Sequence, residues 1–256
     1  MPREAPDALC AVILAAGHGT RLRPLTNVLP KALCPINNVP LLDLALASVS
    51  SYATAVAVNV HHRGRDIIDH LADREIRISD ETDLLLGSAG ALGRLASWID
   101  GRPVLLRNSD AYLSEGLQGL VDGWDGDVVR LLGMRRDGHS DFGDVQYVGA
   151  CLLPAHVVAT LAERPSGLYD LVWRPAWEKG DLEFVQAGGQ FVDCGTPREY
   201  LRANLIASGG DSVVGPGAEV RGRIDRCVVW PGGVVAEGEV LHDCIRVGSD
   251  LTVDAR

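Results

Sequence analysis

The chain has 256 residues, of which 46% are hydrophobic and 23% are charged, and its formal net charge is −10. These values are typical of a globular protein with one large domain, or with one domain and an appendage. The acidic balance argues against nucleic-acid binding, which depends on summed Lys and Arg contacts to phosphates. No apolar stretch reaches the roughly 20 residues that span a bilayer, so we expect no membrane partner either.

The cysteines and the N-terminal segment indicate the compartment. The six cysteines are scattered and form no C-x-x-C pair, which favours neither a zinc site nor a disulfide framework. The first apolar run is short, has acidic residues on its flank and is followed directly by glycines, which argues against a signal peptide. We therefore expect a reduced, cytoplasmic protein.

Strand-like and helix-like stretches alternate through the first half of the chain. Strands are predicted over residues 9–16, 54–60, 75–79 and 102–110, and helices over 40–53, 64–73 and, after a glycine-rich turn, 86–99. Such alternation predicts βαβ units and a mainly parallel sheet that is covered on both faces. Functional loops are then expected at the carboxyl ends of the strands.

The pattern changes from about residue 127. Strands are predicted over 127–134 and 144–154, helices near 155–163 and 168–178, and a hairpin over 182–195. Thr196 and Pro197 form a good N-cap and first-turn pair, which predicts a helix over 196–208.

Apolar residues recur every six residues after Gly209 and Gly210, with glycine-rich turns between them. They are Val214 and Val220, then Val229, Val235 and Leu241. This period is typical of a parallel β-helix, although a small irregular β tail packed on the core remains the alternative. We predict one domain over 1–208 and a short left-handed parallel β-helix-like tail over 209–256. An unfinished β-helix exposes an edge that a second copy could cover, which leaves a homo-oligomer open.

The loop "AAGHGTRLRPLTNVLPKAL" over residues 15–33 follows the first predicted strand. It holds one of only two lysines in the chain, Lys31. Backbone N–H groups of a glycine-rich turn after a strand can bind phosphate. The chain has no Walker A run, and Leu22 stands where a dinucleotide fingerprint needs its third glycine.

A third phosphate loop fits. The stretches "LAAGHGTRLRPLT" (14–26) and "PKALCP" (30–35) resemble the signature of the sugar-1-phosphate nucleotidylyltransferases, L-A-A-G-x-G-T-R-L-x-P-L-T followed by P-K-x-L-x-P. Further segments resemble elements of this family in the expected order: "LLLGSAGAL" (84–92), "NSD" (108–110), "QYVGACLLP" (146–154) and "FVDCGTPREYLRAN" (191–204). The resemblance covers about residues 9–207 and implies an α/β, Rossmann-like nucleotidyltransferase domain with a mixed, mainly parallel sheet.

The resemblance also implies substrates and their binding residues. The implied partners are a nucleoside triphosphate and a sugar 1-phosphate, whose phosphate oxygen attacks the α-phosphorus and releases pyrophosphate. The implied nucleotide-binding residues are Leu14, Ala15, Ala16, Gly17, Gly19, Thr20, Arg21, Gly87, Ala89 and Gly90. The implied sugar-phosphate-binding residues are Asn108, Gly149 and Asp144.

Two cations and two carboxylates carry the implied chemistry. The resemblance places Arg21 on the β- and γ-phosphates and Lys31 near the α-phosphate, where cations offset the charge of two polyanions. It assigns Asp110 and Asp193 to Mg²⁺, which takes one or two carboxylates plus substrate oxygens. Arg21, Lys31 and Asp110 are the implied catalytic residues. Ser109 and Cys194 would be only neighbours of the metal ligands, because an anionic acceptor needs no protein nucleophile.

The segment 135–146 departs from the family pattern. Many members carry E-K-P there, with a lysine for the sugar phosphate, but this chain has no lysine between Lys31 and Lys179. Arg135, Arg136 or Lys179 could substitute, or could be solvated surface residues. Shorter members, similar to the muramate- and heptose-phosphate enzymes, also lack E-K-P.

Several alternatives stay open. The "LGSAG" loop and the hexapeptides look most like the mannose-1-phosphate guanylyltransferase branch, which favours GTP, with UTP next. A cytidylyltransferase acting on another phosphate acceptor is not excluded. A non-catalytic, nucleotide-sugar-binding regulatory homologue would typically lack a loop cation or a metal aspartate. This chain retains all four of these residues, which are Arg21, Lys31, Asp110 and Asp193. An acyltransferase is disfavoured because the tail is short and holds a single histidine, His242.

Overall fold

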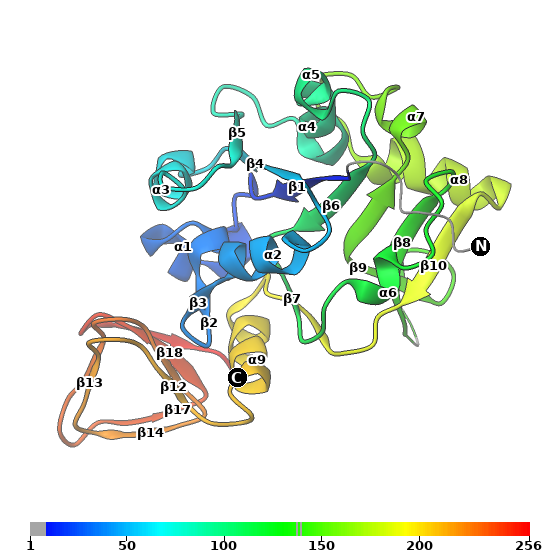
Figure 1. The fold of residues 1–256 in the computed structure, drawn as a ribbon. Helices are drawn as coiled ribbons and strands as arrows, with labels where there is room; N and C mark the ends of the chain where they lie inside the picture. The colour runs from blue at the N-terminus through cyan, green and yellow to red at the C-terminus, as the bar shows by residue number, and fades with distance from the viewer. Residues whose placement is uncertain (1–8, 137, 139) are drawn as a thin grey trace. The chain divides into compact units, whose positions relative to one another are not determined.

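The computed structural model describes residues 9–136, 138 and 140–256, and their contacts divide the chain into two compact units (Figure 1). The first unit holds the described residues up to Gly17 together with Ala45–Ser109 and Glu115–Gln190. The second unit holds His18–Leu44, Asp110–Ser114 and Phe191–Arg256. The domain boundary between residues 208 and 209 stays a prediction.

A seven-stranded sheet forms the centre of the first unit. Its strands are β1 (Cys10–Leu14), β4 (Ala55–Val60), β5 (Arg77–Asp80), β6 (Val104–Asn108), β8 (Val129–Arg135), β9 (Val145–Leu153) and β10 (Leu182–Gln186). They lie in the order β10-β8-β9-β6-β1-β4-β5. Strand β9 is antiparallel to β6 and β8, and the other pairings are parallel. The mixed, mainly parallel sheet predicted from the sequence is confirmed.

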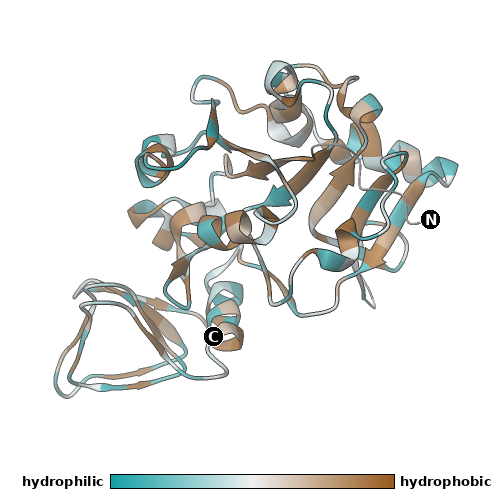
Figure 2. Cartoon of the chain, in the orientation of Figure 1, coloured by the Kyte–Doolittle hydropathy of each residue, from teal (hydrophilic) through white to brown (hydrophobic). Residues whose placement is uncertain are grey.

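Burial explains why these strands read as continuous apolar runs. Strand β1 has the sequence CAVIL and is buried along almost its whole length, as expected of a parallel strand covered on both faces. Figure 2 shows the central strands in the brown of hydrophobic residues.

The helices of the chain up to Lys179 are α1 (Leu25–Val28), α2 (Leu41–Val49), α3 (Gly64–His70), α4 (Gly87–Arg94), α5 (Ala96–Ile99), α6 (Gln118–Val121), α7 (Ala155–Val158) and α8 (Arg174–Lys179), with a π-helical turn over Tyr169–Trp173. None of the helices in the described ranges is both long enough and apolar enough to cross a bilayer.

The hairpin predicted over 182–195 is wrong. Strand β10 pairs in parallel with β8, whereas β11 (Phe191–Asp193) pairs antiparallel with β7 (Ala111–Leu113). The two halves of the segment therefore belong to different sheets. Each residue of the first half pairs with a residue of β8 that lies 53 positions earlier in the chain. Local turn signals carry no information about such distant pairing.

The second unit begins with short elements and a capped helix. Two 3-10 turns, Thr20–Leu22 and Lys31–Leu33, flank α1, and β2 (Pro35–Ile36) pairs antiparallel with β3 (Val39–Pro40). Helix α9 (Pro197–Ala207) starts where the Thr-Pro pair predicts. The Thr196 hydroxyl oxygen accepts a hydrogen bond from the Glu199 N–H at 3.3 Å, which satisfies a free donor of the first turn.

Parallel ladders stack through the C-terminal segment. Its strands are β12 (Val213–Val214), β13 (Glu219–Val220), β14 (Arg223–Asp225), β15 (Val228–Val229), β16 (Val234–Val235), β17 (Val240–His242), β18 (Cys244–Val247) and β19 (Leu251–Asp254). Strands β12, β15 and β18 pair in parallel, as do β13 with β16 and β14 with β17. The three ladders outline a triangle in Figure 1 and are compatible with a β-helix-like tail, whose left hand stays a prediction. Strand β19 turns back and pairs antiparallel with β18, so that it covers the edge of the last coil.

One hydrophobic cluster joins this tail to the signature loop within the second unit. Buried residues of the loop, of α9 and of the tail contact one another, among them Leu22, Leu25, Tyr200, Trp230 and Ile245. The Trp230 indole N–H donates to the Tyr200 hydroxyl at 3.0 Å, and that hydroxyl donates to the Pro35 carbonyl. The tail is therefore part of the core that supports the segment around Lys31.

Candidate active site

The strand pair β7–β11 brings the two predicted metal aspartates together in the second unit. Asp193 is the last residue of β11 and pairs with Ala111, so it lies beside Asp110, which directly precedes β7. The Cys194 N–H donates to the Asp110 carbonyl at 3.1 Å and fixes this corner. A register set by only three residue pairs therefore joins carboxylates that are 83 positions apart in the sequence.

The Lys31 ammonium bridges these carboxylates. Its Nζ lies 2.8 Å from Asp110 Oδ2 and 3.4 Å from Asp193 Oδ1. The Lys31 side chain is only 9% exposed, whereas both carboxylates are nearly half exposed. Burial alone would lower the pKa of Lys31, but the charges and hydrogen bond of the two aspartates outweigh it and raise that pKa above its ordinary value. Lys31 is therefore a fixed positive charge at neutral pH.

Arg21 lies on the outer side of the same cluster. Its Nη2 atom lies 3.2 Å from Asp193 Oδ2, and its side chain is 67% exposed. An exposed ion pair of this kind is worth little stability, so the guanidinium can exchange its partner at small cost. Arg21, Lys31, Asp110 and Asp193 thus form one cluster of alternating charge.

Two glycines let the backbone close around these charges. Gly19 has φ of 61°, and a Cβ atom there would lie 2.9 Å from Thr26 Cγ2 and 3.1 Å from Lys31 Cβ. At Gly195 a Cβ atom would lie 2.7 Å from Arg21 Nη2. The sequence analysis names no role for Gly195, although the segment "FVDCGTPREYLRAN" (191–204) contains this residue. Side chains at either position would push the cations out of place.

A buried carboxylate organises the predicted nucleotide-binding residues of the first unit. Leu14 ends β1, and the Ala15 N–H that follows donates to Asn59 Oδ1 at 2.8 Å. The Asn59 amide donates to Glu81 Oε1 at 2.8 Å, and Glu81 Oε2 accepts from the Leu86 N–H at 2.9 Å. Glu81 is fully buried. The first turn of the signature loop is thus joined by hydrogen bonds to the turn that opens α4.

The sequence reasoning missed both Asn59 and Glu81. Asn59 lies inside a predicted strand, and Glu81 lies among several acidic residues that resemble a solvated turn. The available signal was a polar residue, Asn59, interrupting the apolar run "TAVAVNV". Such a residue in a parallel strand needs a buried partner.

The glycines of the second predicted nucleotide loop serve close packing. A Cβ atom at Gly90 would lie 2.2 Å from the Arg164 carbonyl oxygen, and one at Gly87 would lie 2.6 Å from that of Ser166. The Ala89 N–H donates to the Ser166 carbonyl at 3.0 Å. The segment 162–166 therefore runs directly against α4, which accounts for the early end of the helix predicted over 155–163, since α7 ends at Val158.

The predicted sugar-phosphate residues Asn108 and Gly149 lie on neighbouring strands. The Arg107 side chain is buried and donates to the carbonyl oxygens of both Asn108 and Gly149, at 2.8 and 3.1 Å. Asp144 lies in the turn before β9 and forms an exposed ion pair with Arg135 at 2.6 Å. The Arg135 side chain is 77% exposed, so this ion pair contributes little stability and leaves Arg135 able to exchange its partner.

Neither candidate nucleophile is activated. The Ser109 hydroxyl is buried and donates to the Leu14 carbonyl at 2.8 Å. Burial raises the pKa of the Cys194 thiol to about 12, although the charge of Lys31 opposes this. Neither side chain is suited to covalent catalysis at neutral pH.

The donor set of the charge cluster fits Mg²⁺. Among the side chains that the structure describes, no group of three or more His, Cys, Asp or Glu residues is placed to hold a metal ion. Asp110 and Asp193 offer two carboxylates that share one counter-ion, Lys31. Mg²⁺ commonly uses one or two carboxylates and completes its shell with water and substrate phosphates. Both aspartates are exposed enough for such a shell.

Known proteins are similar to this chain over much of its length. The nucleotidyl transferase family model matches residues 10–169. The chain is 30% identical over 230 residues to the N-acetylmuramate alpha-1-phosphate uridylyltransferase of Caulobacter vibrioides, which covers 75% of this chain and 94% of that protein. It is 27% identical over 232 residues to the mannose-1-phosphate guanyltransferase of Emericella nidulans, which covers 77% of this chain and 63% of that protein.

A solved structure has the same fold at low identity. HddC from Yersinia pseudotuberculosis, complexed with GMP-PN, superimposes with a TM-score of 0.63 at 18% identity, and the match covers 78% of this chain and 99% of that chain. The family model extends over more than half of this chain and includes the glycine loop, Lys31 and Asp110. The chain therefore belongs to the nucleotidyl transferase family.

Proposed function

We propose that the protein transfers a nucleotidyl group from a nucleoside triphosphate to a sugar 1-phosphate and releases pyrophosphate. The observation that carries the proposal is the bridging of Asp110 and Asp193 by the buried ammonium of Lys31. The similarity to relatives named as sugar-phosphate uridylyltransferase and guanyltransferase supports the acceptor class.

The charge cluster suits an in-line displacement at the α-phosphorus. An oxygen of the sugar phosphate forms the new bond to that phosphorus, and the bond to the bridging oxygen of pyrophosphate breaks. Lys31, held in place by its burial and its two partners, would stabilise the negative charge that develops at the α-phosphate. Arg21 is exposed and offers a planar fork of donors, which suits the leaving β- and γ-phosphates.

Asp110 and Asp193 would hold Mg²⁺ in the substrate complex. When bound, the metal supplies charge neutralisation and a template for the phosphates. The aspartates are paired with Lys31 and Arg21, so the cluster offers both cations for phosphates and carboxylates for a metal ion. Direct transfer is further supported by the buried state of Ser109 and by the raised pKa of Cys194.

We further propose GTP as the preferred nucleotide, with UTP as the second candidate. The "LGSAG" turn and the C-terminal ladders favour the guanylyl branch. The relative with 30% identity is named as a uridylyltransferase, which keeps UTP in the comparison.

Pyrophosphate release tests the activity. The purified full chain is incubated with Mg²⁺, each common nucleoside triphosphate and a panel of sugar 1-phosphates. Release with one pair, lost in Lys31→Ala and retained in Lys179→Ala, supports the proposal, because Lys179 is the other lysine of the chain. Nucleotide binding without turnover by any pair would refute it and would favour a regulatory homologue.

A further inference from the structure

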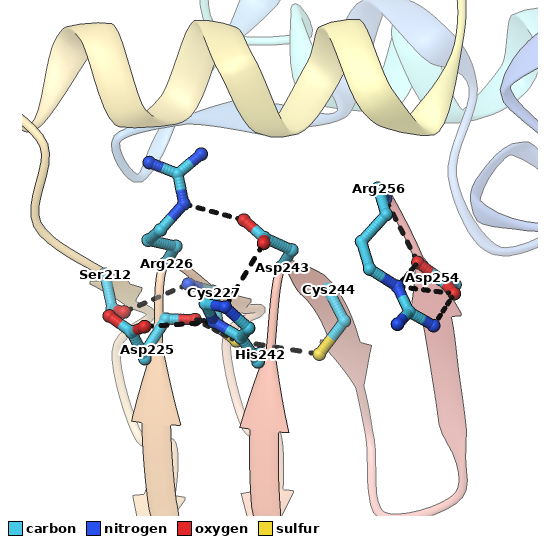
Figure 3. A network of polar contacts seen from close by, with 9 residues as sticks. All are labelled: Ser212, Asp225, Arg226, Cys227, His242, Asp243, Cys244, Asp254 and Arg256. Carbon is cyan, nitrogen blue, oxygen red and sulfur yellow. Dashed lines mark hydrogen bonds and ion pairs between the residues drawn. The ribbon is translucent and has the colours of Figure 1, made fainter.

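Two cysteines of the tail lie side by side on adjacent coils (Figure 3). Cys227 precedes β15 and Cys244 begins β18, and the pairing of Val228 with Ile245 puts the cysteines in register. Their sulfur atoms are 3.6 Å apart, although the residues are separated by 17 positions. Both side chains are buried, Cys227 completely and Cys244 to 5% exposure.

The two thiols are chemically unlike each other. The two sulfur atoms are within hydrogen-bond distance of each other, and Cys227 Sγ also donates to the Asp225 carbonyl at 3.1 Å. The contact between the sulfur atoms lowers the pKa of Cys227 well below its ordinary value and raises that of Cys244. In contrast, burial raises the pKa of Cys10, Cys151 and Cys194. Among these five cysteines, Cys227 therefore forms a thiolate most readily, and the Cys244 sulfur is in contact with it.

Charged groups surround the pair at this end of the tail. His242 lies with Nδ1 3.0 Å from Asp225 Oδ2 and Nε2 3.4 Å from Asp243 Oδ2, and Arg226 pairs with Asp243 at 2.7 Å. Asp254, opposite Cys244 on β19, pairs with Arg256. Figure 3 shows both sulfur atoms within this polar network.

Disulfide geometry is within reach of this backbone. Neighbouring strands lie about 4.8 Å apart, inside the roughly 4.4–6.8 Å that a disulfide needs between Cα atoms. The sulfur atoms must close from 3.6 Å to about 2 Å, which side-chain rotation can supply. The ladder holds both backbones in place before any bond forms.

We propose that Cys227 and Cys244 form a reversible, oxidant-driven disulfide that links two coils of the tail. The oxidant is a small hydroperoxide. The Cys227 thiolate attacks one peroxide oxygen and the O–O bond breaks, which gives a sulfenic acid and hydroxide, or an alkoxide. The Cys244 sulfur then attacks the Cys227 sulfur, the S–O bond breaks and water leaves with the Cys244 proton. Two electrons pass from the thiols to the peroxide, and a dithiol reductant reverses the change.

Differential alkylation of the full chain tests the site. The reduced protein is treated with hydrogen peroxide, its free thiols are alkylated, and its peptides are analysed by mass spectrometry. We expect a cross-linked peptide pair holding Cys227 and Cys244, a mass lower by two hydrogen atoms before alkylation, and full recovery with dithiothreitol. The other four cysteines should stay open to alkylation after denaturation.

Variants and stability add independent readouts. Cys227→Ser and Cys244→Ser should each abolish the cross-link, whereas the matched buried variant Cys10→Ala should keep it. The oxidised wild type should melt about 5 °C higher than the reduced protein, because the disulfide closes the loop between Cys227 and Cys244 and so restricts the unfolded chain. The proposal is overturned if peroxide leaves both tail thiols alkylatable or if the disulfides found join other cysteines. The peptide analysis of the oxidised wild type tests the proposal even if a serine variant fails to fold.

Discussion

Replacing Glu81 by alanine should destabilise the first unit severely. The Glu81 carboxylate is fully buried and accepts hydrogen bonds from the Asn59 amide and the Leu86 N–H, at 2.8 and 2.9 Å. Alanine would leave both buried donors without this acceptor. Each hydrogen bond to a charged group contributes about 1.5–3 kcal/mol, so the free energy of unfolding should fall by about 3–6 kcal/mol.

Urea unfolding followed by circular dichroism measures this loss. Glu81→Gln keeps one acceptor oxygen and should lose about half as much, because one donor still has a partner. Glu75→Ala, an exposed glutamate of the same unit, is the matched control and should change the free energy by less than about 0.5 kcal/mol. If Glu81→Ala costs less than about 1 kcal/mol, the hydrogen bonds described here do not organise the two loops.

Three further perturbations test other parts of the structure. Lys31→Ala should reduce pyrophosphate release by about 100-fold or more in a steady-state assay, because the charge at the α-phosphate is lost; a smaller change than in Lys179→Ala would contradict this role. Gly90→Ala should cost about 1–3 kcal/mol in urea unfolding, since its Cβ would overlap the Arg164 carbonyl, whereas Gly116→Ala meets open space and should be neutral. The raised pKa of Lys31 gives a stability contribution that is fully present below the ordinary lysine pKa of 10.5 and is lost as the pH rises through the folded value. As the pH rises through this range, the free energy of unfolding should therefore fall less in Lys31→Met than in the wild type. If the two proteins lose stability in parallel with pH, the ion pairs of Lys31 with the two aspartates are not formed.

The sequence predicted the parallel part of the fold because its signals are local. Apolar runs such as that of β1 mark strands buried on both faces, and the Thr196-Pro197 pair marks the start of α9. The partner of β10 is set by the distant edge of β8, so the segment 182–195 could not be assigned from its own residues.

The candidate site shows the same division. The signature motif singled out Lys31, Asp110 and Asp193, and the structure brings these side chains into contact. The Asn59–Glu81 hydrogen bond and the packing of α4 on the segment 162–166 depend on contacts between residues far apart in sequence. A motif does not state whether a glycine makes room for a ligand or for a neighbouring backbone segment. At Gly90 the structure shows that it makes room for the backbone at Arg164.

The hydrogen bonds from Trp230 through Tyr200 to Pro35 bear on how such proteins can be recombined. A chain cut after residue 208 would keep Tyr200 but lose Trp230, and the apolar residues of the signature loop would face water at that side. Exchanging the tail with that of a relative would therefore require helix α9 and the loop through Pro35 to be exchanged with it. In evolutionary terms, substitutions in the tail and in the signature loop are therefore expected to occur together, although nearly the whole length of the chain separates the two segments.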